Sequence, residues 1–415
     1  MPHVVFIAPR FLETTNRYVH AFATMPGVTL SVVSADPERA IPKALQSRVA
    51  GHYRIDRVMD PQSLRHAVRE ISKGVGPVDR LAGALEQLQL PMAYVRDALG
   101  IEGIGVQTAQ NFRDKDRMKD VLRTHDVPVA KSALVGSPAA LRTAVEQLGY
   151  PVIVKPQAGV GTRATYRIES DADLVALKSQ GVVPTGEAPL QVEEFVRARE
   201  HTCETISVRG EHVWSSGTRY FPTPLEALET PWMQYCVLLP REDENTEWTR
   251  FQSTNHAALS ALLGAERNTA AGTALTHMEW FLREDGTQLV NEVGIRPPGV
   301  GIMPLMGLAF EMDFFQAWCE LIAFDRFTPK KRKWAAGAAF LRGHGKGKRV
   351  VSVTGVNKAV EACGDALIEL RAPKPGMPRA SGYEGEGFAH IKHATTEGAK
   401  QALLAIIENI KVEYG

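Results

Sequence analysis

The stretch THMEWFLREDGTQLVNEVGIRPPG, residues 276–299, constrains the fold of this chain more than any other. Runs in which apolar and polar residues alternate stand on both sides of Asp285-Gly286. An Asp-Gly pair between such runs is a strong signal for a β-hairpin with a two-residue turn. That turn sets the pairing of the two strands, and it places Glu279 directly opposite Glu292.

The same pairing gives the hairpin a polar and an apolar face, because successive side chains of a strand point to opposite sides. It places His277 opposite Gly294 and Phe281 opposite Val290, and Arg296 ends the face that carries the two glutamates. The other face is predicted to pack into a core and consists of Met278, Trp280, Leu282, Leu289, Val293 and Ile295.

The opposed carboxylates of Glu279 and Glu292 need an explanation, since like charges directly opposite on adjacent strands repel. Either both side chains face solvent, or a cation lies between them. Magnesium is held by one or two carboxylates and completes its shell with water and phosphate oxygens. We favour the cation because His277 and Arg296 lie on the same face.

The glycine-rich segment GVGTRA, residues 159–164, matches the G-x-G-x-x-G/A pattern of a dinucleotide-binding turn. That turn must lead from a strand into a helix, whereas the residues that follow, TYRI, favour a strand. A Walker A loop is excluded too, because no G-K-[ST] follows. What remains is strand, Lys155, glycine loop and strand, which can fold over a phosphate chain, or a plain hairpin with a surface lysine.

Composition narrows the classes of partner and the number of domains. The chain has 415 residues, which predicts two to four domains, and its net charge of +1 gives no reason to expect nucleic acid or an anionic membrane. No apolar run is long enough to span a bilayer. The four cysteines form no closely spaced pair and fit a reducing cytoplasm.

The order of strand-like and helix-like segments predicts α/β and α+β parts. Strands and helices alternate over residues 1–110, which predicts a doubly wound parallel α/β domain. Residues 111–189 and 190–330 are predicted to form a small and a large sheet subdomain. A basic segment, TPKKRK, then leads to a small C-terminal domain at residues 334–415.

Four motifs together resemble the ATP-grasp superfamily in order and approximate spacing: Lys115 on a helix, VIVKP with its glycine loop, VEEFVRARE, and HMEW followed by NEVGIRPPG. The resemblance covers nearly the whole chain. It implies an ATP-grasp fold with an N-terminal pre-ATP-grasp domain and the small C-terminal lid of the biotin carboxylase-like and amino-acid ligase branches.

The resemblance also implies a site for ATP. Lys115 and Lys155 match the lysines that contact ATP phosphates. The other implied nucleotide contacts are Gly159, Gly161 and Thr162 in the phosphate loop, Glu193 and Glu194 at the adenine amino group, backbone groups of Phe195 and Val196, and Glu200 at the ribose hydroxyls.

At the phosphate end, the resemblance makes Glu279 and Glu292 ligands of Mg²⁺, with Mn²⁺ as an alternative, and puts Arg296 beside an acyl phosphate. Many members have Glu-x-Asn after the second strand, whose Asn helps to bind a second metal. Here Gly294 stands at the Asn position, and Asn291 points to the core face in the predicted pairing. The sequence therefore supports one metal site and leaves the second open.

The implied activity is an ATP-dependent ligase that activates a carboxylate as an acyl phosphate, releases ADP and phosphate, and joins the acid to an amine. RPPG resembles the amino-acid ligase branch, so the expected partners are small-molecule acids and amines, and a homodimer is left open. The alternatives are an enzyme similar to biotin carboxylase or to purine-pathway members, and a non-catalytic ATP-binding regulatory module.

Overall fold

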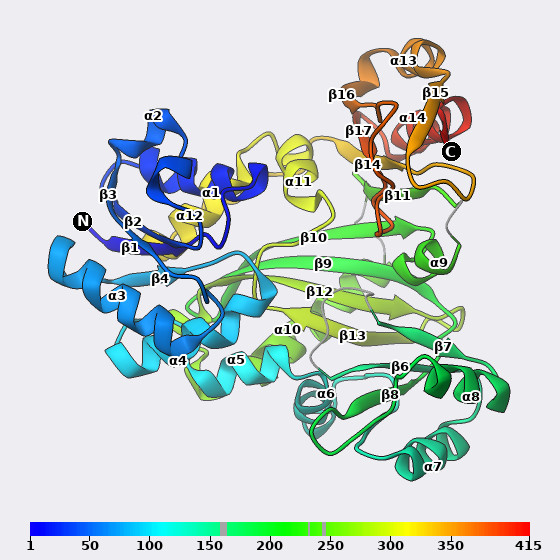
Figure 1. Cartoon of the computed structure of the whole chain (residues 1–415), viewed down its shortest axis with the longest axis horizontal. Coiled ribbons are helices and arrows are strands. Elements are labelled where there is room, and N and C mark those ends of the chain that lie inside the picture. The colour runs from blue at the N-terminus through cyan, green and yellow to red at the C-terminus, as the bar shows by residue number, and fades with distance from the viewer. Residues whose placement is uncertain (158–163, 231–232, 243–245) are drawn as a thin grey trace.

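A computed structural model describes residues 1–157, 164–230, 233–242 and 246–415 of the chain (Figure 1). The glycine loop residues Gly159, Gly161 and Thr162 lie outside these described residues. A long antiparallel sheet crosses the centre of the molecule, with the N-terminal domain at one end, a small sheet below it and the C-terminal segment above it in this view. Within the described residues, no helix is both long and apolar enough to cross a membrane.

The N-terminal domain is a parallel sheet with the strand order β3-β2-β1-β4. Along β1, Val4 and Phe6 pack into the core on the α1 side, whereas Val5 and Ile7 pack against α3 and α4. Helices cover both faces, which confirms the predicted doubly wound arrangement. The elements are β1 (His3–Ile7), α1 (Glu13–Thr24), β2 (Thr29–Ser34), α2 (Lys43–Gln46), β3 (Val49–Arg54), α3 (Pro61–Val75), β4 (Arg80–Ala82), α4 (Gln89–Leu99) and α5 (Val106–Arg113).

A small antiparallel sheet, β5-β8-β6-β7, follows the N-terminal domain. The side chain of Asp114 caps α6 by accepting from the backbone N–H groups of Asp116 and Arg117, and the side chain of Ser170 caps α8 by accepting from the backbone N–H of Asp173. The elements are α6 (Lys115–Thr124), β5 (Ser132–Val135), α7 (Pro138–Leu148), β6 (Val152–Pro156), β7 (Tyr166–Ile168), α8 (Asp171–Ser179) and β8 (Leu190–Glu194).

The central sheet has eight strands in the order β13-β12-β9-β10-β11-β14-β17-β16. Its two faces pack into separate apolar cores, one against α11 and α12 and the other against α10. The elements up to residue 324 are β9 (Arg199–Val208), β10 (Glu211–Phe221), α9 (Pro224–Glu229), β11 (Tyr235–Leu239), α10 (Thr246–Leu263), β12 (Ala274–Leu282), β13 (Gln288–Gly294), α11 (Ile302–Phe310) and α12 (Phe314–Phe324).

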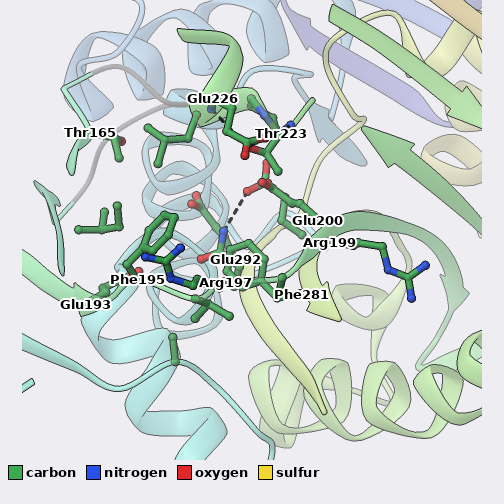
Figure 2. A pocket seen from close by; sticks show the side chains of 18 of the residues that line it. Thr165, Glu193, Phe195, Arg197, Arg199, Glu200, Thr223, Glu226, Phe281 and Glu292 are labelled. Atoms are coloured by element: carbon green, nitrogen blue, oxygen red, sulfur yellow. Dashed lines mark hydrogen bonds between the residues drawn. The ribbon is translucent and has the colours of Figure 1, made fainter. Parts of the chain in front are cut away.

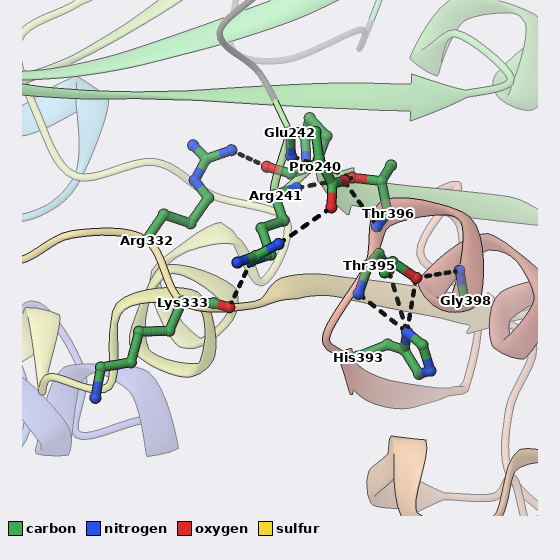
Figure 3. Close-up of polar contacts among 9 residues, drawn as sticks. All are labelled: Pro240, Arg241, Glu242, Arg332, Lys333, His393, Thr395, Thr396 and Gly398. Atoms are coloured by element: carbon green, nitrogen blue, oxygen red, sulfur yellow. Dashed lines mark hydrogen bonds and ion pairs between the residues drawn. The ribbon is translucent and has the colours of Figure 1, made fainter.

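The C-terminal segment continues this sheet, so the boundary predicted near residue 334 falls inside one continuous sheet. Figure 3 shows a further tie: Glu242, just after β11, accepts from the backbone N–H of Thr396 at 2.9 Å, and Arg241 donates to the carbonyl of Lys333. The remaining elements are β14 (Ala335–Leu341), β15 (Val350–Thr354), α13 (Val356–Cys363), β16 (Leu367–Arg371), β17 (Gly387–His393), α14 (Thr396–Asn409) and β18 (Lys411–Tyr414).

Candidate active site

The hairpin β12–β13 confirms two of the predicted pairs, His277 with Gly294 and Glu279 with Glu292. The predicted turn was wrong by one residue. The N–H of Arg283 donates to the carbonyl of Thr287 at 2.9 Å, so residues 284–286 form a three-residue loop, and Gly286 takes a φ of 83°. The predicted pairing of Phe281 with Val290 is therefore wrong, and Phe281 pairs with Leu289 instead.

A bulge at Asn291 restores the predicted pairing farther from the turn, since the register shifts there by one residue. The bulge also corrects the prediction that Asn291 points into the core. Its side chain lines the same pocket as Glu279, and its Nδ2 lies 3.4 Å from Oε2 of Glu279. Leu289, predicted on the core face, instead packs with Phe281 beside the pocket.

A pocket of about 890 Å³ lies between the small sheet and the central sheet. All ten predicted site residues that the structure describes line it: Lys115, Lys155, Glu193, Glu194, Phe195, Val196, Glu200, Glu279, Glu292 and Arg296. Figure 2 shows Phe195 and Arg197 on one side of this pocket and Glu200, Thr223 and Glu226 on another, with Glu292 between them.

The two ends of the pocket differ in chemistry. One end is walled by small and aromatic side chains, among them Ala130, Val196, Ala198 and Phe281, which pack together. The other end carries the lysines, the hairpin glutamates and Arg296. An apolar slot that leads to a cluster of ammonium and carboxylate groups matches a nucleotide, whose base has flat aromatic faces and whose phosphates carry the charge.

Lys115, at the start of α6, gives the two opposed glutamates different electrostatic surroundings. Its Nζ lies 2.5 Å from Oε1 of Glu292. Burial alone would raise the pKa of Glu292, but Lys115 and Lys155 outweigh burial and lower that pKa to about 2. The pKa of Glu279, by contrast, is raised by burial and by the charge of Glu292. Of these two glutamates, only Glu279 lies in surroundings that disfavour its charge.

These two carboxylates fit a magnesium ion that is completed by water and phosphate oxygens. Within the described residues, no group of three or more His, Cys, Asp or Glu side chains is placed to hold a metal ion by itself. A metal bound here would therefore take most of its ligands from substrate and water. The side-chain amide of Asn291 donates from Nδ2 to Oε2 of Glu279, so it is placed to orient that carboxylate.

Lys155 on β6 is held by a buried carboxylate. Its Nζ lies 3.0 Å from Oε2 of Glu193, and Nζ of Lys119 lies 2.7 Å from Oε1 of the same glutamate. Burial would raise the pKa of Glu193, but Lys119 and Lys155 outweigh it and lower that pKa to about 2. Both oxygens of Glu193 thus lie against lysines. Lys119 was not predicted as a site residue, because a lysine inside a helix is usually exposed.

Glu194 and Glu200 occupy different surroundings. Glu194 accepts from the backbone N–H of Lys131 at 2.9 Å and pairs with Arg283 at 3.2 Å, so its side chain connects the small sheet to the hairpin. Glu200 lies on β9, and burial and the charge of Glu279 raise its pKa well above the usual range. Lys155 lowers that pKa only in part.

Three residues in or behind the pocket wall were not predicted from the sequence, because they come from segments far from the predicted motifs. Glu204 on β9 is fully buried and lies opposite His277, whose Nδ1 is 2.8 Å from its Oε1. Glu86 comes from the N-terminal domain, and Tyr383 from the segment between β16 and β17. The alternation of HTCETISV does place Glu204 on the opposite face from Cys203, which was a usable signal for Glu204 alone.

Comparison with known proteins agrees with this geometry. The sequence model for the carbamoyl-phosphate synthase L chain, ATP binding domain, matches residues 114–209. An L-arginine-specific L-amino acid ligase of Bacillus subtilis is 26% identical over 309 residues, which cover 71% of this chain and 68% of that protein. An alanine–anticapsin ligase of Bacillus subtilis strain 168 is 26% identical over 253 residues, 57% of this chain but only 52% of that protein.

Solved structures match over the whole chain. The crystal structure of an L-amino acid ligase from Bacillus licheniformis has a TM-score of 0.77 at 17% identity and covers 100% of this chain and 99% of its own. A carboxyaminoimidazole ribonucleotide synthase from Aspergillus clavatus, solved with ATP, has a TM-score of 0.67 at 18% identity. The match covers 98% of this chain and 97% of that protein.

The chain therefore has the ATP-grasp fold that the resemblance implied, and the family model and the ligase relatives agree with that resemblance. The relatives and structural neighbours are ligases, which supports an enzyme that forms C–N bonds.

Proposed function

We propose that this enzyme phosphorylates a carboxylate with the γ-phosphate of ATP and joins the resulting acyl group to the amino group of an amino acid. The observation that carries the proposal is one pocket in which the apolar slot, the lysines Lys115 and Lys155, the paired glutamates and Arg296 all meet. The phosphoryl group needs in-line positioning and charge neutralisation more than covalent chemistry, and these side chains supply both.

The two steps balance without an oxidant or reductant. A carboxylate oxygen attacks the γ-phosphorus of ATP, the bond to the β-phosphate oxygen breaks, and ADP leaves. The amine nitrogen then attacks the acyl carbon, the C–O bond breaks with release of inorganic phosphate, and the amine proton passes to that phosphate or to water as the amide forms. The guanidinium of Arg296 stabilises the acyl phosphate, and Lys115 and Lys155 neutralise the phosphates of the nucleotide.

Glu279 and Glu292 would hold the magnesium ion, and the bound ion would offset the negative charge of the phosphates. Glu193 would act on Lys155 and not on the adenine, because both of its oxygens already face lysines. Adenine would instead lie between Ala130, Val196 and Phe281, and Glu200 would accept from the ribose hydroxyls.

Amino-acid substrates are supported by one relative and one solved structure whose names include L-amino acid ligase. The test is a screen for ADP and phosphate release across pairs of amino acids, followed by mass spectrometry of the coupled product. The expected result is ADP and phosphate in equal amounts, dependent on both substrates. AMP as the stoichiometric product, or no turnover with any pair, would contradict the proposal; Glu292→Gln serves as the inactive control.

A further inference from the structure

Glu86 reaches into the charged end of the pocket from the N-terminal domain. It opens a short 3₁₀ helix, Glu86–Leu88, and its side chain is only 8% exposed. Its Oε2 lies 2.7 Å from Nε of Arg296, and its Oε1 lies 3.9 Å from Nη1 of Arg113. A carboxylate in this position is stable only because guanidinium groups offset the cost of its burial.

The contact with Glu86 determines how the guanidinium of Arg296 is oriented. Glu86 accepts from Nε, and the carbonyl of Pro297 accepts from Nη1 at 2.9 Å. A guanidinium is a rigid planar fork, so two contacts at different nitrogens fix both its position and its plane. Arg296 lines the pocket in that fixed orientation.

Gly294 leaves the space through which Glu86 makes this contact. A Cβ at position 294 would lie 3.1 Å from Oε2 of Glu86 and 3.6 Å from Nε of Arg296. The glycine is not required by its backbone, which is in strand β13 and takes no positive φ. A Cβ at this position, where the ATP-grasp pattern often has Asn, would therefore force the Glu86 carboxylate to move by a few tenths of an ångström.

We propose that Glu86 is a positioning residue of the ligase reaction, which acts through Arg296, and that Gly294 is required because it admits the Glu86 carboxylate. The inference rests on the proposed function, since the orientation of Arg296 matters to catalysis only if an acyl phosphate forms. The N-terminal domain then contributes to the chemistry as well as to the fold. The alternative is that Glu86 and Arg296 only tie that domain to the central sheet.

Steady-state kinetics of Glu86→Gln and Gly294→Ala separate these two roles. A positioning role predicts that Glu86→Gln lowers kcat at least about tenfold with the KM for ATP within about twofold of wild type. In an Arg296→Lys background, Glu86→Gln should lower kcat by less than about twofold, because the two residues act as one unit. A kcat within about twofold of wild type in folded Glu86→Gln, or losses that multiply in the double variant, would overturn the proposal.

Gly294→Ala removes no charged group and keeps the proposal testable if Glu86→Gln fails to fold. The matched control is Gly299→Ala, since a Cβ there has no neighbour within 4 Å. Gly294→Ala should lower kcat in the same way as Glu86→Gln, whereas Gly299→Ala should not. Equal kcat values for the two alanine variants would overturn the role of Gly294.

A crystal structure of Gly294→Ala gives a readout that does not depend on turnover. The Glu86 carboxylate and the Arg296 guanidinium should both be displaced from their wild-type contact, and an unchanged contact overturns the inference. If wild-type enzyme released no ADP with any amino-acid pair, the proposed function would fail, while this structure would still decide whether Gly294 and Glu86 orient Arg296.

Discussion

Nζ of Lys119 lies 2.7 Å from Oε1 of Glu193, and both side chains are almost completely buried. The other oxygen of this carboxylate lies 3.0 Å from Nζ of Lys155, so one glutamate holds two lysines. Lys119 and Lys115 stand one turn apart on α6, and Lys155 stands on β6. The contact thus connects the helix that starts the small subdomain to the lysine that we expect to bind phosphate.

Replacement of Lys119 by Met should weaken ATP binding although Lys119 itself lies behind the pocket wall. Without Lys119, the whole charge of Glu193 acts on Lys155 and holds it away from the nucleotide. Removing one partner from a buried ion pair should also lower stability by about 3 kcal/mol, the lower end of the usual cost, because Lys155 remains. Calorimetry with MgATP and thermal unfolding measure the two effects; unchanged affinity would rule out the link to Lys155.

Replacement of Lys155 by Ala should reduce the affinity for MgATP at least about tenfold, since a hydrogen bond to a charged group contributes roughly 1.5–3 kcal/mol. The side chain is buried, stands on β6 and lines the pocket. Lys178→Ala, on exposed α8 of the same subdomain, is the control and should bind normally. Calorimetric affinities within about twofold for both variants would remove Lys155 from the nucleotide site.

Acid should destabilise the ligand-free protein through Glu193. Its pKa is about 2 in the folded state against an ordinary value of 4.5, so between these values the unfolded chain binds more protons. The stabilising contribution is complete above pH 4.5 and is lost as the pH falls toward 2; it amounts to at most about 3 kcal/mol. Melting temperature against pH should fall less steeply in Glu193→Gln than in the exposed control Glu187→Gln. Parallel curves would contradict the assignment.

The carboxylate pair could be predicted from sequence, but for a partly fortuitous reason. The turn has one residue more than an Asp-Gly hairpin implies, and the bulge at Asn291 compensates for it, so Glu279 still meets Glu292. Between the turn and the bulge, the predicted pairing of the two strands is shifted by one residue from the observed pairing. Because one residue reverses the face of a side chain, Leu289 and Asn291 were assigned to the wrong side.

The rest of the site depends on contacts between segments that are far apart in the sequence. Glu204 reaches His277 through the pairing of β9 with β12, and Glu86 reaches Arg296 from another domain. Local patterns carry no information about such approaches. The parallel N-terminal sheet, in contrast, follows from local alternation of strands and helices and was predicted correctly.

The two hairpin glutamates should respond in opposite ways to the same substitution in metal-free protein. Glu279 carries a raised pKa, so stability falls as the pH rises above 4.5 and its charge forms; Gln removes that penalty. Glu292 carries a pKa of about 2 because Lys115 and Lys155 favour its charge, and Gln removes that gain. With EDTA at pH 7.5, Glu279→Gln should raise the melting temperature by about 2 °C or more and Glu292→Gln should lower it. Shifts of the same sign would contradict this asymmetry.

The bulge makes Asn291 a test of the metal site. Nδ2 of Asn291 lies 3.4 Å from Oε2 of Glu279, so its amide can orient that carboxylate for Mg²⁺. Asn291→Ala should raise the Mg²⁺ concentration needed for half-maximal ADP release by about tenfold, as expected when a neighbour that orients a metal ligand is lost. Thr287→Ala, exposed at the turn of the same hairpin, is the control. If both variants need the same Mg²⁺ concentration as wild type, the bulge serves the pairing of the strands and not the metal.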